Sequence, residues 1–234
     1  NGHVSLGFLA NTRYETDSKS IEFGVDVDAS EAYLRETQVG LTQGSNFLIA
    51  TRPDGKHYDY DVQGLVGAAY VQAEFRPTDK LAISTGLRAE FARYDYDNQM
   101  LNGNTKDDGT PCGFGGCLYT RPEDRSDDFA GIAPKLGVAF SLSDAMTLYS
   151  NIARGFRAPQ IAELYRLQSG QQVSDLKAET IDSLEVGIRS GKDDVFVEAS
   201  AFAMKKKNSV YKDSNGFNVS GGQSRHLGVE LDWE

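Results

Sequence analysis

The sequence has no run of about 18 apolar residues, the length that a membrane-spanning helix needs. Proline is scarce, with 6 residues, and cysteine is scarcer, with 2. Basic residues number 24 against 34 acidic ones, and no concentrated basic face is visible, which excludes a nucleic-acid partner. Glycine is abundant, with 24 residues, and aromatic residues reach 10%. This balance favours long strands joined by tight turns over a bundle of helices.

Neither end of the sequence has the features of a natural boundary. The first residues, Asn1–Val4, carry neither a basic region nor an apolar signal segment. The last residues, Leu231–Glu234, lie in the middle of an alternating apolar and polar run. We therefore expect the chain to be a fragment of a longer protein.

Alternation of apolar and polar residues, the pattern of a strand with two different faces, recurs along the whole chain. Helical spacing occurs only briefly, near residues 161–167. We expect roughly nine strands, several longer than the five or six residues of most globular sheets. The alternation is clear in residues 21–28, 81–92, 132–142, 184–189 and 227–234 and weaker in residues 4–10, 65–75, 148–156 and 195–204.

The connections between these strands differ systematically in length. In an up-and-down meander, strict alternation of short and long connections places every short turn at one end and every long loop at the other. Bacterial outer-membrane barrels have this asymmetry, with short periplasmic turns and long external loops. The sequence therefore predicts an all-β, antiparallel up-and-down transmembrane β-barrel, although alternation alone would also fit a soluble β-sandwich. Short turns are expected at 15–18, 76–80, 143–145 and 190–194, and longer polar segments at 38–57, 97–127, 158–178 and 212–216.

The two faces of the strands differ as lipid and a barrel lumen require. One parity is apolar, as the lipid-facing side must be, whereas the other carries full charges in mid-strand, among them Arg88, Glu90, Lys135 and Glu185. Charges at these positions suit a wide lumen that is filled with water or a plug.

Aromatic residues gather near the inferred strand ends, where they could form the girdles of a barrel. Tyr94 and Tyr96 change parity relative to Phe91, which indicates either a bulge near Ala92–Arg93 or a strand end above the membrane. The residues expected in the outer girdle are Tyr58, Tyr60, Phe129, Phe156 and Tyr211.

Short motifs follow one another along the chain: Gly86–Arg88, Ala133–Gly137, Leu148–Ser150, Arg154–Pro159, Glu163–Tyr165, Asp175–Thr180, Ser183–Gly187 and Leu227–Leu231. As an ordered set, these motifs resemble the barrel of TonB-dependent receptors. The resemblance covers residues 58–234 well and residues 1–57 only in general character. One departure is Ala178, where the family commonly has proline before glutamate.

The resemblance implies that residues 1–234 are part of one barrel domain of about 22 strands, closed around an N-terminal plug. The plug and the remaining strands would then lie outside this chain. Receptors of this family import a scarce ligand, often a ferric siderophore or another iron chelate, with energy relayed by TonB. We therefore expect a Gram-negative outer membrane protein whose partners are membrane lipid and lipopolysaccharide, a small-molecule ligand, and the TonB complex through the absent N-terminal part. A passive porin-like channel and a soluble β-sandwich binding module are the alternatives.

Cys112 and Cys117 are separated by a glycine-rich segment in the longest polar connection. Such a segment can close a small loop, and an external loop lies in an oxidising compartment. A zinc site is disfavoured because two thiolates lack the further ligands that zinc prefers. We expect a disulfide that stiffens the tip of an external loop.

External loops on a rigid scaffold commonly carry binding groups. Ferric chelates are often anionic and aromatic, so arginine and aromatic side chains would suit them through charge and stacking. The alternative is that most of these residues are solvated or pack loop against loop. The candidates for ligand contact are Phe47, Arg52, Tyr58, Phe114, Tyr119, Arg121, Arg157 and Tyr165.

Catalytic interpretations find little support. His3, His57 and His226 are far apart and belong to no nucleophile or metal motif, so we expect neither an enzyme nor a bound metal or cofactor. The basic run Lys205–Lys207 lies in a strand that approaches the outer rim, where lipopolysaccharide phosphates or water would meet it.

Overall fold

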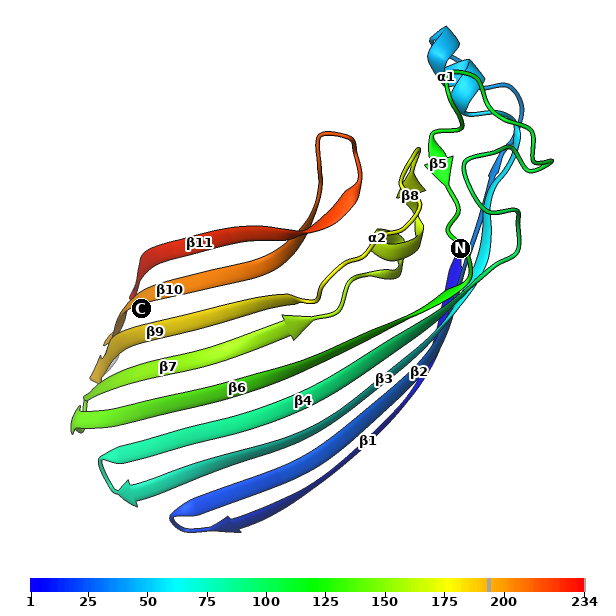
Figure 1. The fold of residues 1–234 in the computed structure, drawn as a ribbon. Coiled ribbons are helices and arrows are strands. Elements are labelled where there is room, and N and C mark those ends of the chain that lie inside the picture. The colour runs from blue at the N-terminus through cyan, green and yellow to red at the C-terminus, as the bar shows by residue number, and fades with distance from the viewer. Residues whose placement is uncertain (193–194, 234) are drawn as a thin grey trace.

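A computed structural model of the protein describes residues 1–192 and 195–233. Within these ranges, nine antiparallel strands form one sheet in the order β1-β2-β3-β4-β6-β7-β9-β10-β11. The sheet curves into the wall of a partial barrel (Figure 1). The predicted all-β meander and its strand count are confirmed. The sheet strands are β1 (Gly2–Thr16), β2 (Lys19–Gln38), β3 (Gly55–Thr78), β4 (Leu81–Asn98), β6 (Arg125–Ser143), β7 (Met146–Arg157), β9 (Glu179–Lys192), β10 (Val195–Lys212) and β11 (Asn218–Trp233).

Four smaller elements lie in the longer connections. Two are short helices, α1 (Asn46–Thr51) and α2 (Ile161–Tyr165), and two are two-residue strands, β5 (Tyr119–Thr120) and β8 (Leu167–Gln168), which pair with each other. The helical spacing near residues 161–167 is confirmed by α2. None of the helices described here is long and apolar enough to cross a membrane.

The connections separate by length as predicted. The short turns between β1 and β2, β3 and β4, and β6 and β7 lie at one end of the sheet, and the longer connections rise from the opposite end (Figure 1). The fourth predicted short turn, at 190–194, includes Asp193 and Asp194, which lie outside the described residues. We call the end with the longer connections the external end.

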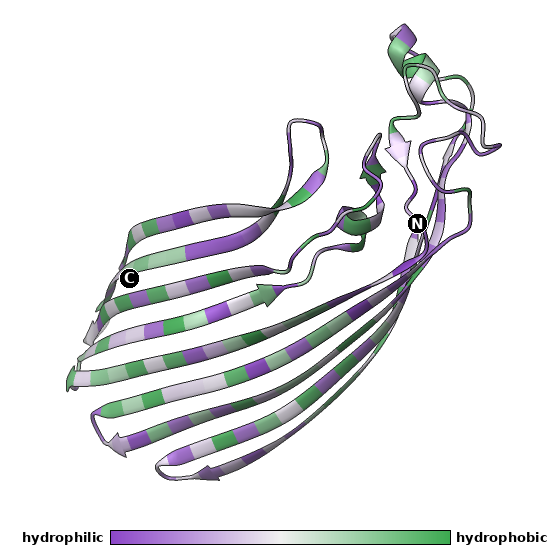
Figure 2. Cartoon of the chain, viewed as in Figure 1, coloured by the Kyte–Doolittle hydropathy of each residue, from purple (hydrophilic) through white to green (hydrophobic). Residues whose placement is uncertain are grey.

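The two faces of the sheet follow the predicted alternation (Figure 2). Cross-strand partners share a face, so Val71, Leu87 and Leu136 lie on the apolar outer face. On the inner face, charged side chains neutralise one another across strands. Arg88 lies 2.6 Å from the carboxylate of Asp26 and 2.8 Å from that of Glu90. The interior face can therefore hold charges that lipid would not accept.

The structure settles the change of parity at the end of β4. The pairing of β4 with β3 and with β6 continues without a register shift from Phe91 to Tyr96, so the predicted bulge near Ala92–Arg93 is wrong. Tyr94 and Tyr96 continue the alternation on the inner face, and Arg93 takes the outward position. The other interpretation, a strand end beyond the apolar band, agrees with this arrangement.

The expected outer aromatic girdle is wrong for three of its residues. Tyr58, Tyr60 and Phe129 face inward and are only 3%, 3% and 8% exposed. They belong to a core that forms between the external ends of the strands and the longer connections, and Phe156 packs against its edge. Aromatic residues here hold the connections in place instead of contacting lipid.

Candidate functional site

The longer connections form a cap at the external end of β1–β4 (Figure 1). The pairing of Tyr119 with Gln168 joins the connection after β4 to the connection after β7. Backbone N–H groups of Gly113 and Leu118 donate to the carbonyls of Ala50 and Thr51, which ties α1 to the same unit. Segments far apart in the sequence thus build one surface.

Both short helices are capped at their N-termini. The Ser45 hydroxyl accepts a hydrogen bond from the N–H of Leu48 at the start of α1. In α2, Gln160 and Glu163 form a capping box, in which the Glu163 carboxylate accepts from the backbone N–H of Gln160 at 2.7 Å. These starts fix the positions of Arg52, just after α1, and Glu163, within α2.

Beneath the cap, stacked tyrosines form a floor. The ring centroids of Tyr96 and Tyr165 lie 4.4 Å apart, and those of Tyr60 and Tyr96 lie 5.1 Å apart. The Tyr165 hydroxyl donates to Asp127 at 2.8 Å. Burial raises the pKa of Tyr165, so its hydroxyl stays protonated and remains a donor. This packing supports Tyr165 in a structural role.

The guanidinium of Arg121 is buried in the cap and bonded to backbone carbonyls. Its nitrogens donate to Leu101, His57 and Thr105 at distances between 2.6 and 3.2 Å. A buried arginine that satisfies several carbonyls at once fixes the path of the chain around it. Arg121 therefore organises the cap from within.

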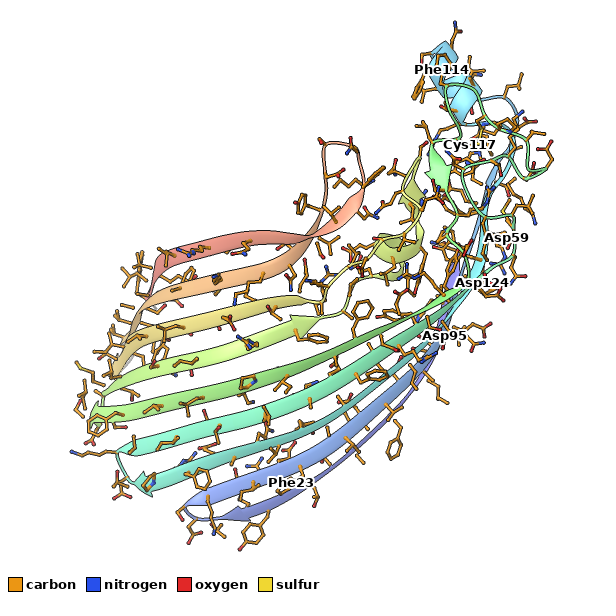
Figure 3. All side chains as sticks on the ribbon, viewed as in Figure 1. Phe23, Asp59, Asp95, Phe114, Cys117 and Asp124 are labelled. Carbon is orange, nitrogen blue, oxygen red and sulfur yellow. A yellow bond between two sulfur atoms is a disulfide. The ribbon has the colours of Figure 1, made fainter. Side chains whose placement is uncertain are left out.

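The predicted disulfide between Cys112 and Cys117 is confirmed, and their Cα atoms lie 4.9 Å apart. It closes the segment that docks against α1 and places Phe114 at the tip of the cap (Figure 3). Phe114 packs edge-on against Phe47 of α1, with ring centroids 5.5 Å apart, and both rings remain exposed. The disulfide holds this aromatic pair at the outermost point of the cap.

A pocket of about 590 Å³ opens between the cap and the external ends of the strands. Its volume lies within the range of about 300–1,000 Å³ that is usual for small-molecule sites. Three of the connections at this end contribute to it, together with the external ends of strands such as β10 and β11. The lining residues are Glu36, Leu48, Arg52, Tyr58, Leu118, Tyr119, Ala162, Glu163, Arg166, Gln168, Lys212 and Asn218.

The acidic side chains of the pocket are neutralised. Glu36 lies 2.5 Å from Arg166, and Glu163 lies 3.3 Å from Arg157. By contrast, within the part of the chain that the structure describes, Arg52 and Lys212 form no ion pair, and both side chains are exposed. The pocket therefore offers two uncompensated positive charges, a feature that favours an anion.

Two tyrosines give the pocket an aromatic wall. Tyr58 donates its hydroxyl hydrogen bond to the carbonyl of Leu167 at 2.9 Å, and the guanidinium of Arg166 lies 6.0 Å from its ring centroid. Among residues 1–192 and 195–233, the Tyr119 hydroxyl is buried and has no hydrogen-bond partner. Burial raises the pKa of Tyr119, so this hydroxyl is a protonated donor. Tyr119 therefore contributes to the wall of the pocket, while its hydroxyl lies buried inside the cap.

The eight residues predicted for ligand contact fall into three groups. Arg52, Tyr58 and Tyr119 line the pocket together. Phe47 and Phe114 form the exposed pair at the tip. The other three have partners within the protein: Arg121 and Tyr165 are buried, and Arg157 pairs with Glu163 and Glu179.

Sequence reasoning missed several lining residues, notably Glu36, Arg166 and Lys212. Arg166 directly follows the Glu163–Tyr165 motif, and Lys212 begins the predicted connection 212–216. The place of each residue in the sequence could therefore have indicated it as a candidate for the site. Glu36 had none, because the end of a polar strand reads like any other solvated stretch. His57 is buried and stacks on Tyr119, with ring centroids 4.4 Å apart.

Comparison with known proteins places this geometry in a family. A model described as TonB dependent receptor-like, beta-barrel, matches residues 3–234. The TonB-dependent heme receptor A of Haemophilus ducreyi is 29% identical over 164 residues, which are 62% of this chain and 21% of that receptor. The chain thus spans only a part of the length of this relative.

Two solved structures share the fold. The copper transporter OprC has a TM-score of 0.72 and 17% identity, and the ferric-catecholate import receptor Fiu of E. coli K12 has 0.68 and 19%. Each likeness covers 99% of this chain and 35% of the other protein. The matches are to receptors and transporters, so the prediction that the chain is not an enzyme is confirmed. Because the family model covers residues 3–234, the chain belongs to the TonB-dependent receptor family, as part of its outer-membrane β-barrel.

Proposed function

We propose that this chain is part of the barrel of a receptor that takes up a scarce anionic ligand, an iron chelate, with energy relayed by the TonB complex. The plug domain and the remaining strands would lie elsewhere in the complete receptor, and the TonB complex would act through its N-terminal part. The pocket beneath the cap would capture the ligand from outside.

The observation that carries this proposal is the pair of uncompensated cations at the pocket. Arg52 follows α1 and Lys212 ends β10, and both leave positive charge available, while Glu36 and Glu163 are already neutralised. Tyr58 and Tyr119 add an aromatic wall to the same pocket. Ferric chelates that present carboxylate or catecholate oxygens would satisfy these groups.

Similar proteins support an iron chelate as the ligand class. Fiu is described as importing ferric catecholate, and further structural matches are described as a ferric yersiniabactin uptake receptor and a ferric citrate transporter. Haem is the second candidate, because the curated relative is a heme receptor. His57 gives haem little support, since its ring is buried and its Nε2 lies 2.8 Å from the carbonyl of Pro53.

Binding to the complete receptor tests the ligand class. Ferric citrate, a ferric tricatecholate and haem would be titrated by calorimetry against wild type and the double variant Arg52→Gln/Lys212→Gln. Charge-assisted hydrogen bonds are each worth about 1.5–3 kcal/mol, and the double variant loses two of them, so it should bind a ferric chelate at least about 100-fold more weakly. Lys177→Gln, which removes an exposed external charge outside the pocket, is the matched control and should bind like wild type.

Uptake measurements separate the alternatives. Accumulation of iron from the chelate should require an intact TonB complex, whereas a passive channel would continue to work without it. Tighter binding of haem than of either chelate would replace the iron-chelate proposal with haem uptake. Equal chelate binding by the double variant and wild type would remove this pocket from the mechanism.

A further inference from the structure

Arg121 is a buried cation without a counter-charge. It is only 1% exposed. Arg125, at the start of β6, pairs with Asp127, whereas within residues 1–192 and 195–233 Arg121 forms no ion pair with a carboxylate. The partners of its guanidinium are backbone carbonyls and one hydroxyl, none of which carries a net charge. Because burying an unpaired charge is costly, a negative group is expected beside it.

Two tyrosine hydroxyls of the same region also lack a partner. Among the side chains that the structure describes, only the hydroxyls of Tyr96 and Tyr119 are buried and make no hydrogen bond. The two residues are 3% and 4% exposed, so bulk water does not reach them freely. A tyrosine hydroxyl is protonated at neutral pH and has a hydrogen bond to donate. Buried polar groups without a partner are rare in folded proteins, and these two call for one.

The connection after β4 folds back above the external strand ends, which brings the three groups together (Figure 1). The guanidinium carbon of Arg121 lies 5.5 Å from the ring centroid of Tyr119. Tyr96 and Asn98 share the inner face of β4. The Asn98 amide donates to the carbonyl of Pro122 at 3.4 Å, and Pro122 directly follows Arg121 in the chain. Tyr96 and Tyr119 also belong to one buried core.

The missing partner is an acceptor, because every unsatisfied group here is a donor. Nη1 of Arg121 carries two hydrogens and, within the described residues, makes one hydrogen bond, to the carbonyl of His57 at 3.2 Å. One guanidinium N–H is therefore left over in addition to the two tyrosine O–H groups. A water molecule could accept from these donors, but it would leave the positive charge uncompensated.

We propose that the cap holds one small monovalent anion, of the size of chloride, between Arg121, Tyr96 and Tyr119. The remaining guanidinium N–H and the two O–H groups would donate to it, and its charge would balance that of Arg121. Hydrogen bonds of this charged kind are stronger than neutral ones. The anion would join the end of β4 to the connection that follows it and so stabilise the cap before a ligand arrives.

The anion site is separate from the ligand pocket. Arg121 and Tyr96 do not line the pocket, and Tyr119 contributes to its wall while its hydroxyl is buried. A site enclosed to this degree is suited to a single ion and not to a chelate. The site does not depend on which ligand the receptor transports, so failure of either proposal leaves the other standing.

Bromide is a suitable probe, because it resembles chloride and gives an anomalous X-ray signal. Crystals of the complete receptor would be grown with sodium bromide and, separately, with sodium gluconate, whose anion is too large for the site. The bromide data should show an anomalous peak within hydrogen-bond distance of Arg121 and of the Tyr96 and Tyr119 hydroxyls. Density there without an anomalous signal would identify a water molecule and overturn the proposal, as would the absence of any density.

Hydrogen–deuterium exchange tests whether the anion acts in solution. The dissociation constant comes from a bromide titration at a fixed sodium concentration, with gluconate as the replaced anion. At about ten times that constant, the amides of residues 99–124 that exchange by opening of the cap should exchange about 10-fold more slowly than in gluconate alone. Equal exchange in the two salts would overturn the proposal.

Conservative variants make the outcome specific. Tyr96→Phe/Tyr119→Phe keeps both rings and should fold like wild type, since neither hydroxyl has a partner in the described part of the protein. It should lose the bromide peak and most of the protection by bromide. Tyr58→Phe is the matched control, because the Tyr58 hydroxyl already donates to the carbonyl of Leu167, and it should keep the bromide response. A full bromide response in the double variant would rule out this site.

Discussion

The ring of Tyr149 on β7 lies over Gly187 of β9, where a Cβ atom of residue 187 would stand only 2.5 Å from the ring's Cζ atom. The same relationship joins Phe202 to Gly228 and Tyr70 to Gly24 on neighbouring strand pairs. Rings that cover cross-strand glycines stabilise strands which glycine alone would weaken. Gly187 and Gly228 stand in two of the sequence motifs, and this packing is their physical reason.

Gly187→Ala should therefore destabilise the complete receptor, because the added methyl group displaces the Tyr149 ring. Overpacking of this kind costs about 1–3 kcal/mol. The measurement is the urea midpoint of unfolding in detergent, followed by heat-modifiable gel mobility. Gly67→Ala is the matched control, since no atom lies within 4 Å of a Cβ built there, and its midpoint should stay near wild type. A shift of the same size in both variants would contradict the packing argument.

Charge should be tolerated on one face of β9 and β10 and rejected on the other. Val186 faces outward opposite Ala201, and an arginine in its place would meet lipid at a cost of about 2–4 kcal/mol near the bilayer centre. Ser200 faces inward opposite Glu230, where an arginine would find a carboxylate. Val186→Arg should reduce the folded yield in membranes far more than Ser200→Arg. Similar yields would mean that the outer face does not contact lipid.

Labelling on whole cells can test the orientation of the barrel in the membrane. Gln43 lies in the connection between β2 and β3, and Asp144 lies in the turn between β6 and β7, and both are exposed. With a membrane-impermeant maleimide, Gln43→Cys should react on intact cells and Asp144→Cys only after lysis. The reverse pattern would place the cap and its pocket in the periplasm.

How much of this structure the sequence could predict depends on the range of each signal. The strands and their order followed from local features, because alternation such as that of Leu184, Val186 and Ile188 needs only the neighbouring residues. Strictly alternating connection lengths then gave the two ends of the barrel. The disulfide was also local, since Cys112 and Cys117 close their own loop.

The pocket could not be predicted from local features of the sequence. Its walls combine Glu36, Arg52, Arg166 and Lys212 from four different parts of the chain, and no periodicity links them. The polarity of the external segments could not show which of their residues would be buried. Tyr58, for example, looked like a residue of a lipid-facing girdle, yet it packs beneath the cap. Contacts between connections that are far apart in the sequence determine which of these residues are buried.

The mouth of the lumen holds a buried carboxylate, Glu179, whose side chain is 6% exposed. Burial alone would raise the pKa of this carboxyl. That effect is outweighed by Arg157 at 2.7 Å, by the backbone N–H of Val210 at 3.0 Å and by Lys206 at 3.1 Å. Together they lower the pKa of Glu179 from 4.5 to about 2. Glu179 thus joins the start of β9 to the ends of β7 and β10.

A carboxyl whose pKa is lower in the folded state than in the unfolded state stabilises the protein at pH values above its unfolded-state pKa. This stabilisation disappears as the pH falls through the folded-state pKa. At neutral pH, Glu179→Gln should therefore lower the thermal unfolding midpoint of the complete receptor. The difference from wild type should begin to shrink below pH 4.5 and vanish near pH 2, where wild-type Glu179 also becomes neutral. Scanning calorimetry at steps across this range measures both midpoints. Asp175→Asn removes an exposed carboxylate from the connection that leads into β9. Its unfolding midpoint should differ little from that of wild type at any pH. A difference in unfolding midpoint between wild type and Glu179→Gln that stays constant down to pH 2 would mean that the packing of Glu179, and not its charge, holds these strands together.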